Sequence, residues 1–158
     1  MRVLLLALAV LSAAATVSAG EFKAGDLLVM HPVVRATPGG AKVGGGYLTV
    51  RNTGSMPDRL VAIESSIAGR VEIHASSIEN GIASMRALTN GLPVPAGGEA
   101  TLSPGGNHVM FVDLKAPFRT GETVSATLIF ERAGRVPVTF AVEPIGGAKP
   151  AGATHQGH

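Results

Sequence analysis

The sequence has no cysteine and no tryptophan, and only one tyrosine among its 158 residues. Without a thiol, these residues cannot form a disulfide framework, an iron–sulfur centre, a thiolate zinc site, a CxxC redox site or a Cys-linked lipid anchor. A blue-copper centre is excluded as well, because it needs a thiolate ligand. The 13 Lys and Arg nearly balance the 11 Asp and Glu and form no basic block, which argues against a nucleic-acid partner.

Enzyme signatures are also missing from the sequence. It contains no GxSxG elbow, phosphate loop, HExxH motif or dinucleotide fingerprint. The carboxylates Asp58, Glu72, Asp113 and Glu131 are scattered singly and are interpreted as ordinary strand-end or solvent-face residues. We therefore expect a protein that is not an enzyme.

The first 19 residues have the layout of a secretory signal peptide. Arg2 precedes an apolar run from Val3 to Leu11, and small residues follow up to Val17-Ser18-Ala19. The apolar run is short beside the roughly 20 residues that a bilayer-spanning helix needs, so a membrane anchor is the weaker interpretation. We predict cleavage after Ala19 and an exported mature protein located in the periplasm, with no membrane anchor.

The rest of the chain predicts an all-β fold. Its 21 Gly and 10 Pro punctuate short apolar runs, several of which alternate with period two, and no helical stripe of ten or more residues is present. This pattern predicts an antiparallel sandwich or barrel of eight or nine short strands in a single domain over residues 20–145. The clusters TPGG (37–40), GGG (44–46) and NGLPVPAGG (90–98) are interpreted as turns, and residues 146–158 as a flexible tail.

Histidine and methionine are the residues that could carry chemistry. His108 and Met110 are two residues apart, so on a strand their side chains share one face. His74 is predicted to end a strand, on the face opposite Val71 and Ile73. A hairpin through residues 80–81 would bring Met85 back towards His74. Taken singly, each of these residues is more often a packing or surface residue.

Two imidazoles with two thioethers suit Cu(I). Thioether sulfur is soft, polarisable and neutral, so it favours the soft monovalent ion over hard divalent ions. In an oxidising compartment a thioether also escapes loss to disulfide formation. The remaining candidates receive structural interpretations: the pair Met30 and His31 is expected to be structural, and Met56 is expected to be a partly exposed turn residue.

The order His74, Met85, His108-x-Met110 resembles the periplasmic copper chaperone family PCu(A)C. The segments GRVEIH (69–74) and LSPGGNHVMFVDLKAPFRTGETVSATLIFERAG (102–134) agree with this, and the resemblance covers about residues 29–142. It implies a cupredoxin-like Greek-key β-sandwich. One departure is visible, because many members have Met directly after the first histidine, where this chain has Ala75.

The resemblance also implies a function. One Cu(I) would be held near the surface by His74, Met85, His108 and Met110, with the bend at residues 104–106 leaving His108 and Met110 accessible. The protein would be a monomeric copper chaperone in cytochrome c oxidase assembly, delivering copper to the dinuclear centre of subunit II, together with a Sco-type thiol protein. The alternative is a periplasmic copper-sequestering or resistance protein without a dedicated acceptor.

The tail supplies a separate candidate site. His155 and His158 lie within four residues of each other at the end of the sequence, a donor set suited to Cu(II). Some members of the resembled family carry a C-terminal extension that takes Cu(II), and this tail is similar to a short version of one. The competing interpretation is a disordered tail with incidental histidines.

Overall fold

The computed structural model describes residues 20–147, and this part of the chain is built from β-strands and connecting turns without any helix. It therefore contains no helix that could cross a membrane. The strands are β1 (Glu21–Ala24), β2 (Leu27–Arg35), β3 (Val43–Asn52), β4 (Asp58–Glu64), β5 (Ala68–Glu79), β6 (Ile82–Ala87), β7 (Leu92–Val94), β8 (Glu99–Leu102), β9 (His108–Leu114), β10 (Thr123–Phe130) and β11 (Gly134–Glu143).

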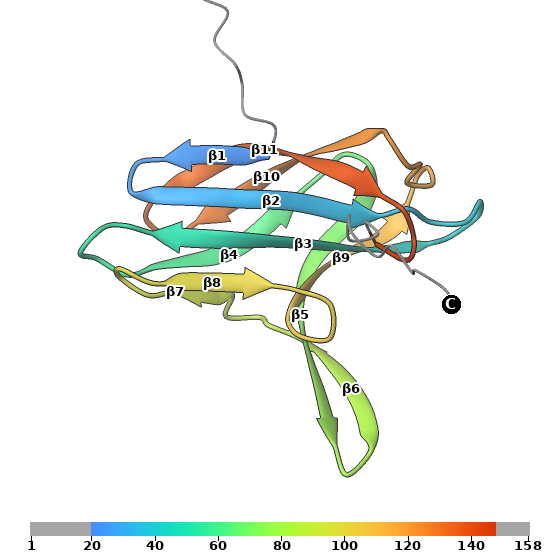
Figure 1. Ribbon diagram of the computed structural model, residues 1–158, viewed down its shortest axis with the longest axis horizontal. Helices are drawn as coiled ribbons and strands as arrows, with labels where there is room; N and C mark the ends of the chain where they lie inside the picture. The colour runs from blue at the N-terminus through green and yellow to red at the C-terminus, as the bar shows by residue number, and fades with distance from the viewer. Residues whose placement is uncertain (1–19, 148–158) are drawn as a thin grey trace, which may run out of the picture.

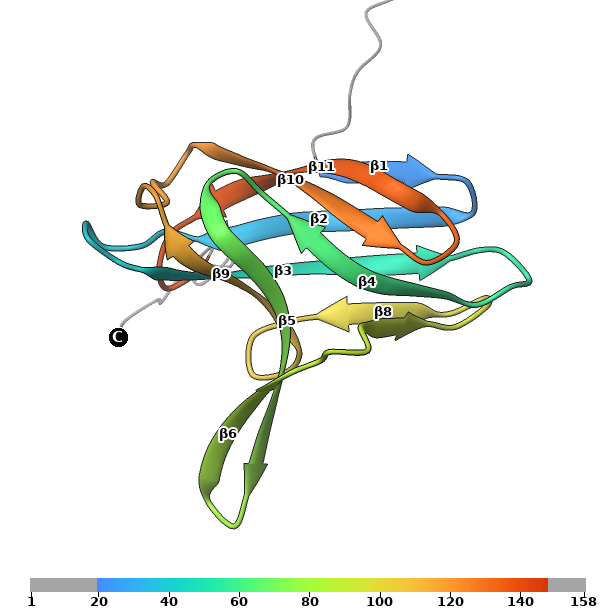
Figure 2. The ribbon, with the colours of Figure 1, turned by 180° about the vertical axis from the view of Figure 1, so that it is seen from behind.

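The strands form one continuous hydrogen-bonded sheet that folds over itself into two layers (Figures 1 and 2). Its order is β6-β5-β9-β3-β2-β11-β10-β4-β7, with β1 added to β2 and β8 added to β3. All pairs are antiparallel except β11 with β2. The all-β class predicted from the sequence is confirmed.

Two strands were not predicted, which makes eleven rather than eight or nine. β1 is four residues long, and β7 lies inside the stretch 90–98 that was interpreted as a turn. Proline is tolerated in β7 because this is an edge strand of the sheet. Among the described residues no strand pairs with its outer side, so the missing N–H of Pro93 interrupts no ladder there. Leu92 and Val94 on either side of it are buried in the core.

The core lies between the two layers and follows from alternation along the strands. In β11, for example, every second residue from Val136 to Val142 is buried. Aromatic rings fill the centre: the ring of Phe111 contacts Phe118 and Phe140 edge to face, with centroids 5.3 and 5.8 Å apart. Such arrangements are the preferred geometry for aromatic pairs.

The triplet 44–46 is part of β3 and not a turn, so that prediction was wrong. A side chain at Gly44 would begin 2.6 Å from the ring of Phe118, and one at Gly46 would begin 3.1 Å from the ring of Phe111. Both distances are too short for ordinary contact, so these glycines let the backbone of β3 pass close to the aromatic core.

Strands β5 and β6 form a hairpin that projects from the body as an arm (Figures 1 and 2). Its turn is Asn80-Gly81, with φ of 51° and 78°, the positive values that a two-residue hairpin turn needs. All six residues of β6 are exposed, as are residues 77–79 of β5. Strand β5 thus belongs to the body at its beginning and to the arm at its end.

Candidate metal centre

The four predicted ligands lie on three neighbouring strands, β6, β5 and β9. His74 on β5 is directly opposite His108 on β9, and Ala87 of β6 faces His74 from the other side. Two residues back along β5, Glu72 is opposite Met110. Two residues forward, Ser76 is opposite Met85. Because directly paired residues point to the same face of a sheet, all four ligands face the same side.

Alternation explains why this side is the outer one. Ile73 lies between Glu72 and His74 along β5, and Val109 lies between His108 and Met110 along β9. Both apolar side chains are buried in the core. Burial of these apolar neighbours forces the side chains at 72, 74, 108 and 110 to the opposite face of the sheet. The apolar pattern of β5 and β9 therefore determines the face on which the imidazoles stand.

The two histidine rings form a close pair. Their centroids are 5.6 Å apart, and the ring planes meet at 64°. The side chain of His74 is 18% exposed, and His108 is 8% exposed. The bend at residues 104–106 is present, with Gly105 at a φ of 82°, but it does not leave His108 accessible as predicted.

The two methionines are placed unequally around this pair. Met110 is half-buried on β9, next to His108 on the same face and diagonal to His74, a relation that spans about 7–8 Å between Cα atoms. Met85 is also one diagonal step from His74, but it lies on the projecting arm and is 64% exposed. The structure thus gathers His74, His108 and Met110, and holds Met85 at the edge of the group.

His74 does not end a strand, and that prediction was wrong. β5 continues for five more residues to Glu79, and the predicted hairpin through Asn80-Gly81 then returns as β6. The register pairs Met85 with Ser76 rather than with His74. Ala75 follows His74 along the strand, so its side chain points to the other face, away from the candidate ligands.

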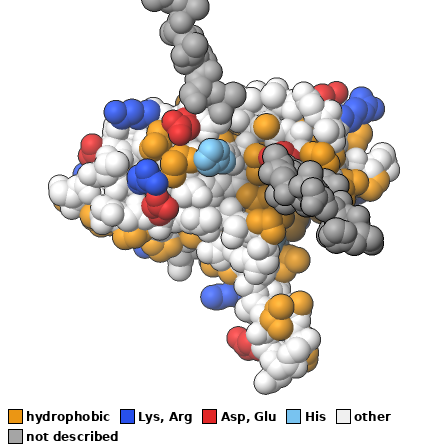
Figure 3. Space-filling model, viewed as in Figure 1, with side chains coloured by type: hydrophobic (Ala, Val, Ile, Leu, Met, Phe, Trp, Pro, Cys, Tyr) orange, Lys and Arg blue, Asp and Glu red, His pale blue; other side chains and the backbone are white. Residues whose placement is uncertain are grey.

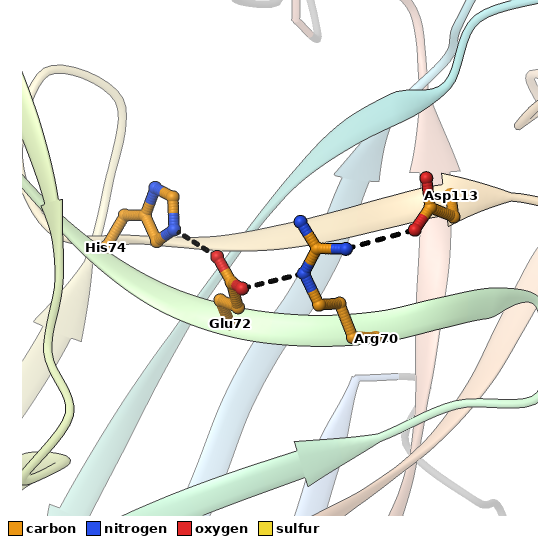
Figure 4. A network of polar contacts seen from close by, with 4 residues as sticks. All are labelled: Arg70, Glu72, His74 and Asp113. Atoms are coloured by element: carbon orange, nitrogen blue, oxygen red, sulfur yellow. Dashed lines mark hydrogen bonds and ion pairs between the residues drawn. The ribbon is translucent and has the colours of Figure 1, made fainter.

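Glu72 is the residue of this group that sequence reasoning missed, because it was interpreted as an ordinary surface carboxylate. Its Oε2 lies 2.7 Å from Nε2 of His74, and its Oε1 accepts a hydrogen bond of 2.8 Å from Nε of Arg70. Arg70 also pairs with Asp113, at 3.0 Å (Figure 4). The signal was available: Glu72 and His74 are two residues apart, the same spacing that linked His108 with Met110.

The electrostatics of this chain of contacts favour an ionised Glu72. The hydrogen bond with His74, followed by the hydrogen bond from Arg70, lowers the pKa of Glu72, while desolvation opposes the shift. An ionised carboxylate can only accept hydrogen bonds, so Nε2 of His74 must carry a proton. Nδ1 of His74 is buried and has no hydrogen-bond partner within the described residues. Leaving a buried polar atom unsatisfied costs about 1–3 kcal/mol, and the lone pair of Nδ1 is therefore a candidate metal donor.

The donors on this face fit a soft metal ion. They are two imidazoles, one neighbouring thioether and a second thioether on the arm, which together are the ligand types that select Cu(I). Residues 20–147 hold no cluster of three or more His, Cys, Asp or Glu side chains placed to bind a metal. The two methionines are the further donors on which the predicted site relies.

The other candidate residues are separate from this group. His31 sits at an irregularity in the pairing of β2 with β3, has a φ of 51° and donates its backbone N–H to the carbonyl of Gly20. Met56 is an exposed residue in the turn before β4, and its carbonyl accepts a hydrogen bond from Asn52. Met56 is thus the exposed turn residue that was predicted, and neither residue belongs to the candidate centre. His155 and His158 lie outside the described residues, as does the predicted signal peptide.

Comparison with protein families finds one model that spans most of the chain. The family "Putative lipoprotein LpqE-like" matches residues 27–142, from the start of β2 almost to the end of β11. A curated relative, "Putative lipoprotein Lxx21020" of Leifsonia xyli subsp. xyli (strain CTCB07), is 37% identical over 99 residues, or 63% of this chain. The match spans only 60% of that protein's length.

Comparison with solved structures finds PCuAC domains. The copper-bound PCuAC domain from PmoF2 is 30% identical, with a TM-score of 0.67, and the match covers 78% of this chain and 97% of that domain. The solution structure of Cu(I)-bound DR1885 from Deinococcus radiodurans is also 30% identical, with a TM-score of 0.58 and coverage of 71% and 74%. Both of these proteins were solved with copper bound.

Proposed function

The chain belongs to the LpqE-like family, which is of PCuAC type, and from this membership we propose that it binds and carries copper as Cu(I). The resemblance to PCu(A)C proteins drawn from the sequence is thereby confirmed. The observation that carries the proposal is the pair of imidazoles with Met110 beside them, on one face of β5 and β9. We infer that His74, Met85, His108 and Met110 are the ligands.

The arrangement suits a carrier more than a permanent metal centre. His74, His108 and Met110 stand on the body of the sandwich, while Met85 stands on the exposed arm. Thioethers are neutral and weakly basic donors, so ligands of this kind can be exchanged one at a time for those of an acceptor. Met85 is the ligand that an acceptor could reach and replace first, because it is the most exposed of the four.

The copper site is tested by competition for Cu(I) with a chromophoric chelator. We expect one equivalent of Cu(I) to bind, and the affinity to fall at least about tenfold in His108→Ala and in Met110→Ala, since each removes a direct donor. Met56→Ala is the matched control, because Met56 is exposed in a distant turn and its replacement should leave the affinity unchanged. Unchanged affinity in both site variants would show that the ligands lie elsewhere.

We further propose a destination for the copper. The chain acts as an exported, periplasmic chaperone that takes part in cytochrome c oxidase assembly, delivering Cu(I) to the dinuclear centre of subunit II as a monomer. Without a thiol of its own it cannot reduce the acceptor's cysteines, so a Sco-type thiol protein would supply that step. The predicted signal peptide over residues 1–19 supports export, and residues 155 and 158 are the proposed tail site for Cu(II).

Delivery is tested with the Cu(I)-loaded chain and the purified, reduced acceptor domain of subunit II. After separation of the two proteins, copper should be found in the acceptor, and one-electron oxidation with ferricyanide should produce the purple absorption of the dinuclear centre. Copper that stays with the chain would favour the sequestering or resistance function. Loss of Cu(II) binding on deletion of residues 150–158, followed by electron paramagnetic resonance, tests the tail separately.

A further inference from the structure

The two histidines of the candidate centre make their polar contacts through different ring nitrogens, His74 through Nε2 and His108 through Nδ1. We propose that Glu72 is a positioning residue that fixes His74 in the tautomer protonated at Nε2, so that His74 binds Cu(I) through Nδ1 whereas His108 binds it through Nε2. This inference rests on the proposed function, because it names the atoms with which the proposed ligands hold the ion.

For His74, the assignment follows from the partner of each ring nitrogen. Nε2 lies 2.7 Å from Oε2 of Glu72, and a carboxylate offers only lone pairs at that distance. The proton of the neutral ring must therefore be on Nε2, and Nδ1 keeps its lone pair. Nδ1 is buried and has no hydrogen-bond partner among residues 20–147, so its lone pair is available to a metal ion.

For His108, the same reasoning gives the opposite result. Nδ1 lies 3.1 Å from the carbonyl oxygen of Gly106, which can only accept a hydrogen bond. The proton is therefore on Nδ1, and the hydroxyl of Ser76, 3.4 Å away, is a second and weaker partner of the same nitrogen. Nε2 of His108 keeps the lone pair. The bend at residues 104–106 thus serves to bring a carbonyl onto this ring.

Glu72 is itself held in place from the side away from His74. Arg70 donates to Oε1 of Glu72 from Nε and pairs through a second nitrogen with Asp113, so that Arg70 lies between two carboxylates (Figure 4). Asp113 has a φ of 56°, a left-handed conformation that aspartate adopts more readily than most residues other than glycine. Its side chain is exposed, whereas Phe111 and Leu114 on the same strand are buried.

The contacts with Arg70 and His74 also keep Glu72 from becoming a metal ligand. A carboxylate that could turn freely would offer a hard oxygen donor and favour divalent ions. With one oxygen bound to Arg70 and the other to His74, both oxygens of Glu72 are already used. Carboxylates in this position orient a ligating imidazole and raise its basicity, and their loss commonly lowers metal affinity 10- to 100-fold.

The test is a long-range ¹H–¹⁵N correlation spectrum of the full chain labelled at its histidine rings, recorded before and after one equivalent of Cu(I). In the copper-free protein, His74 should show a proton on Nε2 that exchanges slowly with water, and His108 should show one on Nδ1. Addition of Cu(I) should shift the ¹⁵N resonance of Nδ1 in His74 and of Nε2 in His108, while both ring protons remain.

Two variants make the test specific to Glu72. In Glu72→Ala the slowly exchanging proton of His74 should disappear and the Cu(I) affinity should fall by about 10- to 100-fold. Glu72→Gln, which keeps an amide oxygen as acceptor, should recover part of both. Glu79→Ala is the matched control, because it removes the same charge from an exposed position of the same strand and should change neither.

The outcomes separate the two proposals. If Cu(I) binds and shifts Nε2 of His74, or if the copper-free ring carries its proton on Nδ1, the assignment of the nitrogens is overturned while the copper site stands. If Cu(I) shifts neither ring, the proposed function fails, and with it the inference that depends on it.

Discussion

The body of the sandwich and the arm formed by β5 and β6 follow opposite rules. In the body, alternate residues of each strand are buried, and four phenylalanines fill the space between the layers. On the arm every residue of β6 is exposed, including large apolar side chains at Ile82 and Met85, and Figure 3 shows hydrophobic side chains on this projection. The candidate centre lies where the two regions join. The hairpin of β5 and β6 thus has a partly buried beginning within the body and an exposed end that carries the proposed ligand Met85.

The strongest way to break the body is to remove its central ring. Phe111 is fully buried and contacts two other rings, so Phe111→Ala should lower the free energy of unfolding by about 3–5 kcal/mol. Chemical denaturation followed by circular dichroism measures the change. Val43→Ala, on the exposed face of the neighbouring strand, is the control and should cost no more than about 0.5 kcal/mol. Similar losses in the two variants would mean that the body has no such centre.

The arm should respond in the reverse way. Met85→Ala removes an exposed side chain, so the free energy of unfolding should change by no more than about 0.5 kcal/mol, while the Cu(I) affinity should fall about tenfold or more. Ile82→Ala changes an equally exposed apolar residue on the same strand and should affect neither quantity. Competition titration and denaturation of both variants provide the comparison. If both variants lowered the Cu(I) affinity equally, the effect would come from the apolar surface of the arm and not from the thioether of Met85.

The smallest effect should come from an ion pair of the body far from the centre. Hydrogen bonding and charge from Arg135 lower the pKa of Glu64, so the folded state favours the ionised carboxylate. The stabilisation is therefore present above the pKa of the unfolded chain, about 4.3, and is lost as the pH falls through the lower folded value. Glu64→Gln should be slightly less stable than the parent at pH 7, the difference should vanish in acid, and copper binding should not change. A difference that grows in acid would contradict this sign.

Much of the fold could be predicted because alternation is a local signal. The apolar runs in β10 and β11 show this alternation directly, and Gly or Asn residues mark the hairpin turns in the sequence. What failed depended on partners distant in the sequence. The glycines of β3 look like a turn until the rings of Phe111 and Phe118 occupy the space where side chains would be. β7 is a strand only because β4 pairs with it.

The arrangement of the candidate centre, like the fold, could be predicted only in part from the sequence. The spacing of His108 and Met110 placed them on one face, and the Asn80-Gly81 turn brought β6 back along β5. The role of Glu72 was missed because a single carboxylate looks like a surface residue until its partners are known. The burial of His108 was missed because a bend in the chain indicates neither what lies beside the ring nor which carbonyl meets it.

The alternation that separates core from candidate ligands along β5 and β9 also limits how this protein can change. Inserting or deleting one residue between Arg70 and Ile73, with the pairing before it kept, would turn the imidazole inward and Ile73 outward, and would disrupt the core and the candidate metal site together. Changes of two residues preserve the faces and only shift the ligands along the strand. Length variation among related chains should therefore be confined to the tip of the arm and the loops, with the strands between the ligands altered by substitution alone.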